Sequence, residues 1–151
     1  MSNQTLPSLF FDGVAKGNPG TAGARCIIIM PEGTTVHRFA WGLGHSSSIQ
    51  AEAMALFQGT KFLQKLDYKE ANVLGDSQVI IQALVNKSIP KDLHLARILL
   101  RIKGMTKSMK LKFFHVLRMN NKEADKEANK AAQLDAGSLL KDNEILWDPI
   151  P

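Results

Sequence analysis

Four acidic residues in four different local contexts could together hold divalent metal ions. They are Asp12, Glu52, Asp76 and Asp125. Each lies beside an apolar strand or on a helix face of small residues, where an unpaired charge is costly. Four carboxylates brought together need a partner of opposite sign, and a pair of divalent cations is the obvious one. Such a site is typical of metal-dependent phosphoryl-transfer enzymes.

Taken singly, most of these acids also have an ordinary structural explanation. Asp12 ends an expected strand and precedes a glycine-rich turn, where Asp is common. Glu52 is expected near the start of a helix, where an acid complements the helix dipole. Asp76, in a Gly-Asp-Ser sequence, could cap a helix. Asp125 lies among alanines and is harder to explain as surface charge. The separations of 40, 24 and 49 residues mean that only a fold could bring the four together.

The elements that must position these acids follow from the spacing of apolar residues. The expected strands are residues 8–12, 23–30, 34–42, 71–75 and 111–116. The first expected helix begins after Ser47, and its apolar residues recur over residues 51–66. The other expected helices cover residues 77–86, 93–103 and 121–134. Ser47 and Gln50 fit a capping box, Asp92 is an expected N-cap, and Gly104 is an expected helix stop. Three strands followed by helix, strand, two helices, strand and helix predict an α/β fold: a five-stranded mixed sheet with helices on both faces.

Size and charge narrow the class of protein. The chain has 151 residues, a length typical of one domain, and a net charge of +5. Seven Lys and Arg residues against one Asp fall within residues 91–112, which indicates either a phosphate-contacting surface or a solvated helix face. We expect a catalytic domain over residues 1–134. Residues 135–151 are too apolar for a free tail, so we expect them to pack on the domain or on a neighbouring domain or subunit.

Other features exclude several classes of protein. The first residues lack the basic and apolar segments of a secretory signal, and no apolar run is long enough to span a bilayer. The chain has one cysteine, Cys26, which cannot form an intrachain disulfide and is expected to be buried. We therefore expect an intracellular protein without a membrane partner.

The order of the motifs resembles the type 1 ribonuclease H family, and most closely its short plant and retroelement-type members. The matching segments are FDGVAKGNPGTAG from Phe11, the Ala51-Glu52 pair, the GDSQ turn from Gly75, and NKEAD from Asn121. The resemblance covers residues 9–134. Each motif is weak alone, but in this order and on this pattern of elements the set is specific.

This resemblance implies hydrolysis of the RNA strand of an RNA–DNA hybrid with two Mg²⁺ ions, for which Mn²⁺ could substitute. Asp12 would contact both metals, Glu52 and Asp76 would hold one, and Asp125 would hold the other. One metal would lower the pKa of a water, and the other would stabilise the leaving 3′ oxygen. The expected products carry 5′-phosphate and 3′-hydroxyl ends.

The resemblance also implies residues that bind the hybrid. The Gly13 backbone, the Glu52 carboxylate and the Gln78 side chain match positions near the RNA strand, where the 2′-hydroxyl distinguishes RNA from DNA. Asn18 matches a position that reads the minor groove, although Asn-Pro-Gly is also a strong turn signal by itself.

Two departures from the family pattern bear on the substrate. Where many members carry asparagines before the glutamate, this chain has Ser48 and Ile49. Ser48 can still hydrogen-bond to the substrate, but Ile49 cannot replace an amide. We therefore expect weaker hybrid affinity or strand discrimination. The loop before the last expected helix lacks the histidine of bacterial members, and it holds Arg118, either a phosphate contact or an ordinary exposed residue. His115, at the end of an expected strand, is interpreted as structural.

Two alternatives remain open from the sequence. A non-catalytic nucleic-acid-binding or connection module could use the same fold, but it would gain nothing from a costly acidic cluster. A related nuclease acting on DNA would share the metal chemistry but not the glycine-rich first turn or the GDSQ turn. The sequence does not distinguish a stand-alone enzyme from a domain of a polyprotein.

Overall fold

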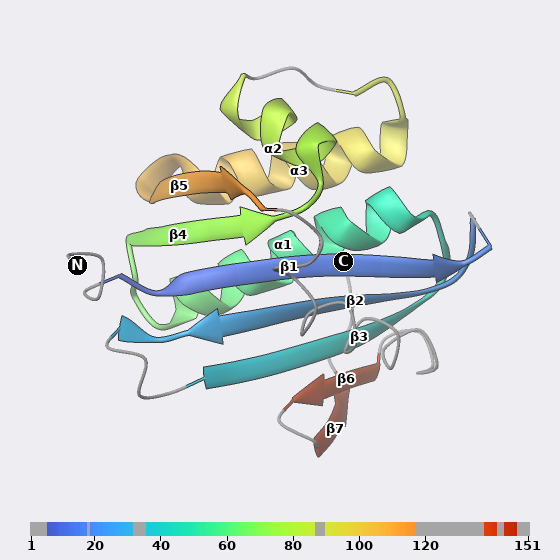
Figure 1. Cartoon of the computed structure of the whole chain (residues 1–151), viewed down its shortest axis with the longest axis horizontal. Coiled ribbons are helices and arrows are strands. Elements are labelled where there is room, and N and C mark those ends of the chain that lie inside the picture. The colour runs from blue at the N-terminus through green and yellow to red at the C-terminus, as the bar shows by residue number, and fades with distance from the viewer. Residues whose placement is uncertain are drawn as a thin grey trace.

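In the computed structural model, the described strands form one mixed sheet in the order β5-β4-β1-β2-β3-β6-β7 (Figure 1). The structure describes residues 6–17, 19–31, 36–86, 90–116, 138–141 and 144–147. The strands are β1 (Ser8–Lys16), β2 (Gly20–Ile29), β3 (Val36–Ser46), β4 (Glu70–Gly75), β5 (Lys110–His115), β6 (Ser138–Lys141) and β7 (Glu144–Trp147). The helices are α1 (Ser48–Lys65), α2 (Gln78–Val85) and α3 (Leu93–Met105), followed by a 3₁₀ turn, Thr106–Ser108. The α/β class and the five expected strands are confirmed, and two further strands extend the sheet.

The first three strands form an antiparallel meander, as the short connections between them predict. The prediction that β1 ends at Asp12 is wrong, because pairing with β2 continues from Asp12↔Arg25 to Lys16↔Thr21. Small residues line this extension, and Gly17 closes the hairpin with a φ of 83°, a left-handed conformation that suits glycine. Asp12 therefore lies inside a regular strand with its backbone fixed on one side by β2.

Strand β4 lies parallel to β1 and sets the position of the third acid. The last paired residues are Phe10 and Leu74, so Asp12 and Asp76 each follow that pair by two residues. Strand β5 pairs in parallel with β4 on its other side. The carboxyl end of β4 is thus brought level with the middle of β1.

Helix α1 forms the centre of the core. Its predicted capping box is confirmed: the Gln50 N–H donates to Ser47 Oγ at 3.2 Å, and the Ser47 N–H donates to Gln50 Oε1 at 3.3 Å. The helix packs against β1 and β2 on one side and against α3 on another. The core joins apolar side chains from all of these elements, among them Leu9, Phe11, Ile28, Leu56, Leu63, Leu99 and Ile102.

Helix α3 begins at its predicted cap but ends later than predicted. Asp92 Oδ1 accepts a hydrogen bond from the Leu95 N–H at 2.9 Å. The helix continues through Gly104 to Met105, so the prediction that Gly104 stops it is wrong. Glycine in a helix costs only about 1 kcal/mol, and Gly104 has no positive φ that would end the helix.

The cap at Asp92 predicts a pH-dependent contribution to stability. The Leu95 N–H lowers the pKa of Asp92 below its ordinary value of 3.8, against a smaller opposing effect of desolvation. Stability from this cap is present above the unfolded pKa and is lost as the pH falls through the lower folded pKa. We expect Asp92→Ala to lower the melting temperature by a few degrees at pH 7, and the difference to shrink below about pH 4. Asp92→Asn keeps a capping side chain without the charge. A fall in its melting temperature equal to that of Asp92→Ala would contradict this account.

The C-terminal part of the sequence adds the two further strands. Strand β6 pairs with β3, with Ala40 opposite Leu140, and β7 pairs with β6.

The expected helix over residues 121–134 lies outside the described residues. The three described helices pack against one another. The division into a domain of residues 1–134 and an extension stays a prediction. None of the described helices is long and apolar enough to cross a membrane.

Candidate active site

Three of the four predicted acids lie together at one edge of the α1–sheet interface. Asp12 comes from β1, Glu52 from α1, and Asp76 directly follows β4. One carboxylate oxygen from each lies within 4.8 Å of the other two. Asp125, the fourth predicted acid, lies outside the described residues. The described part of the site is therefore a cluster of three carboxylates, which we call the carboxylate cluster.

Close approach of two backbones places Glu52 beside Asp12. A Cβ atom at Gly13 would lie 2.6 Å from Ala51 Cβ and would overlap the Glu52 backbone nitrogen, so only glycine fits there. No acidic residue occupies the first turn of α1, so Glu52 lies beyond the reach of the helix dipole. The close packing of Gly13 on α1, and not attraction to the helix dipole, therefore accounts for the position of Glu52.

The position of Asp76 is fixed by contacts on both sides of β4. Gly75 packs against the Phe11 ring so closely that a Cβ atom would collide with it. On the other side, the Val116 N–H donates to the Gly75 oxygen at 2.9 Å. The His115 Nε2 lies 3.2 Å from the Asp76 backbone oxygen, consistent with its predicted structural role. The loop that carries Asp76 is therefore held at its start by both neighbouring strands.

The carboxylate cluster could hold a divalent metal ion. Asp12 is only 2% exposed, and its Oδ1 has no hydrogen-bond partner among the described residues. A buried carboxylate oxygen without a partner is costly, and a hard cation bound by oxygen ligands would satisfy it. The donor set, three carboxylates from β1, α1 and the residue after β4, fits such an ion.

One charged residue of the site was missed in the sequence. Arg25 is the residue of β2 paired with Asp12, and it is 1% exposed. Arg25 lies in the strand expected at residues 23–30, within the otherwise apolar run Ala24–Met30 that led to the expectation of a buried Cys26. The available signal was a single cation inside that run, since Arg is almost never fully buried without a charged partner.

The predicted substrate-binding residues have different surroundings. Gly13 is buried at the α1 contact, Ser48 is half-buried in the first turn of α1, and Gln78 is exposed at the start of α2. Asn18 and Arg118 lie outside the described residues, so their predicted roles stay predictions.

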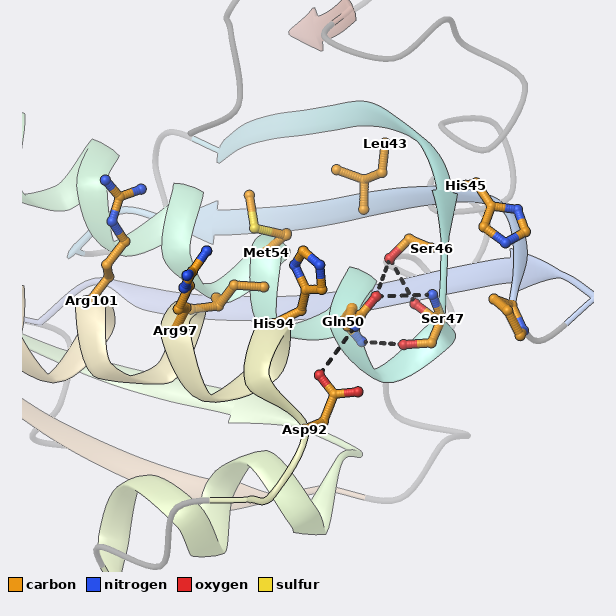
Figure 2. Close-up of a pocket in the computed structure, with 12 residues that line it drawn as sticks. Leu43, His45, Ser46, Ser47, Gln50, Met54, Asp92, His94, Arg97 and Arg101 are labelled. Atoms are coloured by element: carbon orange, nitrogen blue, oxygen red, sulfur yellow. Dashed lines mark hydrogen bonds between the residues drawn. The ribbon is translucent and has the colours of Figure 1, made fainter.

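A groove of about 970 Å³ runs between the start of α1, the end of β3 and α3 (Figure 2). Its charged or ionisable lining residues are His45, Asp92, His94, Arg97 and Arg101. The two arginines come from the basic stretch of residues 91–112, whereas the lysines of that stretch are not among the described residues that line the groove.

Hydrogen bonds hold the two helices that form the groove. The Gln50 amide donates to Asp92 Oδ1 at 3.4 Å and so links the first turn of α1 to the cap of α3. The Ser46 hydroxyl also donates to Gln50 Oε1, at 3.1 Å (Figure 2). Gln50 and Met54 line the groove, whereas Glu52 is rotated about 200° from Gln50 around the helix axis. The groove and the carboxylate cluster therefore flank opposite sides of the start of α1.

Comparison with known proteins identifies the family. A sequence model of the reverse transcriptase-like family, which has the ribonuclease H fold, matches residues 10–131. The chain belongs to the type 1 ribonuclease H family. It is 28% identical over 123 residues to ribonuclease HI of Halobacterium salinarum. The resemblance predicted from the motifs is thereby confirmed.

Solved structures of this ribonuclease H family share the fold. Ribonuclease H1 from Halobacterium salinarum superposes with a TM-score of 0.77 at 27% identity, over 83% of this chain and 96% of that one. The N-terminal ribonuclease H domain of Rv2228c from Mycobacterium tuberculosis superposes with a TM-score of 0.79 at 26% identity, over 84% of this chain and 98% of that one. LC11-RNase H1, isolated from compost and solved with an RNA/DNA hybrid, superposes with a TM-score of 0.76 at 27% identity, over 83% of this chain and 96% of that one.

The chain corresponds to only part of some full-length relatives. It spans 62% of the length of the halobacterial ribonuclease HI and 36% of the mycobacterial bifunctional protein Rv2228c. The halobacterial relative is named ribonuclease HI, and the superposed structures are named ribonuclease H1 or ribonuclease H domain.

Proposed function

We propose that this domain hydrolyses the RNA strand of RNA–DNA hybrids at the carboxylate cluster. The observation that carries the proposal is the meeting of Asp12, Glu52 and Asp76 oxygens within 4.8 Å, with a buried Asp12 oxygen that lacks a described partner. A binding module would have no use for such a cluster, whose mutual repulsion is costly. The hybrid bound to LC11-RNase H1 supports the same substrate for this chain.

In this proposal the four acids would hold two Mg²⁺ ions, and Asp12 would contribute to both. Glu52 and Asp76 would hold one of them, and Asp125 would hold the other. When bound, such ions supply an activated water and stabilise charge on the leaving 3′ oxygen. The rigid elements hold the carboxylates so that little reorganisation is needed when the phosphodiester binds. The products carry 5′-phosphate and 3′-hydroxyl ends.

The RNA strand is recognised next to the cluster. The Gly13 backbone lies against the Glu52 backbone at the β1–α1 contact, and Glu52 contributes its carboxylate to the cluster, where a 2′-hydroxyl could donate and accept hydrogen bonds. Gln78 is exposed two residues after Asp76 and can reach the same strand. Ser48 supplies a hydroxyl on the first turn of α1. Asn18 and Arg118 complete the proposed set.

The groove on the other side of α1 suits the DNA strand. Arg97 and Arg101 carry permanent positive charge, and Arg101 lies 5.8 Å from the centre of the Phe57 ring, which orients its guanidinium. His45 and His94 add hydrogen-bond donors. A duplex that lies across the start of α1 would then place one backbone at the cluster and the other in the groove.

The test is a substrate panel of labelled hybrid, double-stranded RNA and double-stranded DNA, each with Mg²⁺, Mn²⁺ or EDTA. We expect cleavage of the RNA strand of the hybrid with either metal and no cleavage in EDTA. Faster cleavage of DNA would favour the related DNA nuclease. Binding of the hybrid without cleavage would favour the non-catalytic module.

The groove is tested separately in the same assay. Arg97→Gln should raise KM several-fold, leave kcat nearly unchanged, and reduce the salt dependence of binding by about one phosphate contact. Lys107→Gln removes one charge from the exposed turn after α3, outside the groove, and serves as the control. Equal effects of the two substitutions would show that the groove makes no specific contact.

A further inference from the structure

Arg25 lies in an unusual position for a cation. In the strand register, its backbone is paired with that of Asp12 in β1 on one side and with that of Ala40 in β3 on the other, in the middle of the sheet. Residues paired directly across antiparallel strands project from the same face, with Cβ atoms about 5 Å apart. Arg25 is 1% exposed and Asp12 is 2% exposed, so water screens their interaction little. The strand register therefore places the side chains of Arg25 and Asp12 next to each other on one face of the sheet, inside the protein.

We propose that Arg25 is a built-in counter-cation of the carboxylate cluster, which stabilises the metal-free site and weakens its affinity for divalent metal. The proposal rests on the metal-binding part of the proposed function. The three described carboxylates carry a formal charge of −3, and the guanidinium brings this to −2, the charge that one divalent ion neutralises. Arg25 and a bound metal would thus compensate the same Asp12 charge, and each would reduce the effect of the other.

This role differs from that of a simple packing residue. Burying a guanidinium is costly unless a charged partner lies nearby, and the carboxylate cluster is costly for the opposite reason. Their juxtaposition lowers both costs in the absence of metal. The Arg25 guanidinium and a metal ion bound beside the same carboxylate repel each other, so the stability that Arg25 gives to the metal-free protein is linked to its metal affinity. Removal of Arg25 should therefore tighten metal binding. A residue that only filled space would change the melting temperature but not the metal affinity.

The experiment compares the wild type with Arg25→Met and Arg25→Lys by calorimetric titration with Mg²⁺ and by thermal unfolding in EDTA and in saturating Mg²⁺. We expect Arg25→Met to melt at a lower temperature than the wild type in EDTA and to bind Mg²⁺ at least about tenfold more tightly. Its melting temperature should also rise more on addition of Mg²⁺ than that of the wild type. Arg25→Lys, which keeps the charge, should bind Mg²⁺ as the wild type does. Unchanged or weaker affinity in Arg25→Met would overturn the inference.

A second measurement does not depend on the folding of an Arg25 variant. In EDTA, Asp12→Asn removes the counter-charge of Arg25 and should lower the melting temperature, whereas Glu52→Gln relieves repulsion in the cluster and should lower it less or raise it. If Asp12→Asn raises the melting temperature at least as much as Glu52→Gln, Arg25 is not the counter-cation. Absence of Mg²⁺ binding in the wild type would instead contradict the proposed function.

Discussion

Asp76→Asn should abolish Mg²⁺-dependent cleavage of the hybrid while the protein stays folded. The substitution removes a negative oxygen from the carboxylate cluster but keeps the shape of the side chain. Under the proposed function, the cluster then holds the metal poorly, and a metal contributes several kcal/mol to stabilisation of the transition state. We expect kcat/KM to fall on the order of a thousandfold or more. Single-turnover cleavage of a labelled hybrid gives the rate, and thermal unfolding checks the fold.

The chain offers a matched control for the loss of one carboxylate. Asp67 is exposed in the turn after α1 and has a φ of 63°, a left-handed conformation that Asn also tolerates. Asp67→Asn should therefore keep both activity and stability. Full activity in Asp76→Asn would contradict the assignment of this acid. An equal loss in Asp67→Asn would mean that overall charge, and not the cluster, controls cleavage.

The elements that carry the acids were predictable because their signals are local. The capping box at Ser47 and the cap at Asp92 each involve residues three apart, and both form the bonds that their sequences predict. The length of β1 was not predictable in this way, since it depends on pairing with β2 far along the hairpin. The two strands after residue 137 were likewise read only as apolar residues that must pack, because their pairing with β3 is not local.

The same distinction applies to the site. The order of the four motifs pointed to a shared site, and the structure brings three of the acids within 4.8 Å. Neither the contact of Gly13 with α1 nor the pairing of Arg25 with Asp12 is visible in local sequence, because each joins residues brought together only by the sheet or by the packing of α1 on it. Sequence order thus indicates which residues meet, whereas the fold determines how closely and beside which charges.

Gly13→Ala should damage both stability and activity, although it adds a single methyl group. The new Cβ would overlap the Glu52 backbone nitrogen and lie 2.6 Å from Ala51 Cβ, where no flexible side chain can move aside. Overpacking of this kind costs about 1–3 kcal/mol. Strand β1 and helix α1 must separate to relieve it, and that shift moves Glu52 away from Asp12. Displacement of about 1 Å in a catalytic site lowers the rate about a hundredfold, so we expect a loss of that order in kcat/KM.

Gly104→Ala provides the contrasting case in the same chain. A Cβ at Gly104, in the last turn of α3, meets no atom within 4 Å. Because Ala favours a helix over Gly by about 1 kcal/mol, this variant should be slightly more stable than the wild type and equally active. Chemical denaturation and hybrid cleavage measured on both variants separate the effects. If Gly13→Ala lost stability but kept its cleavage rate, the close contact would serve only packing, and the placement of Glu52 would not depend on it.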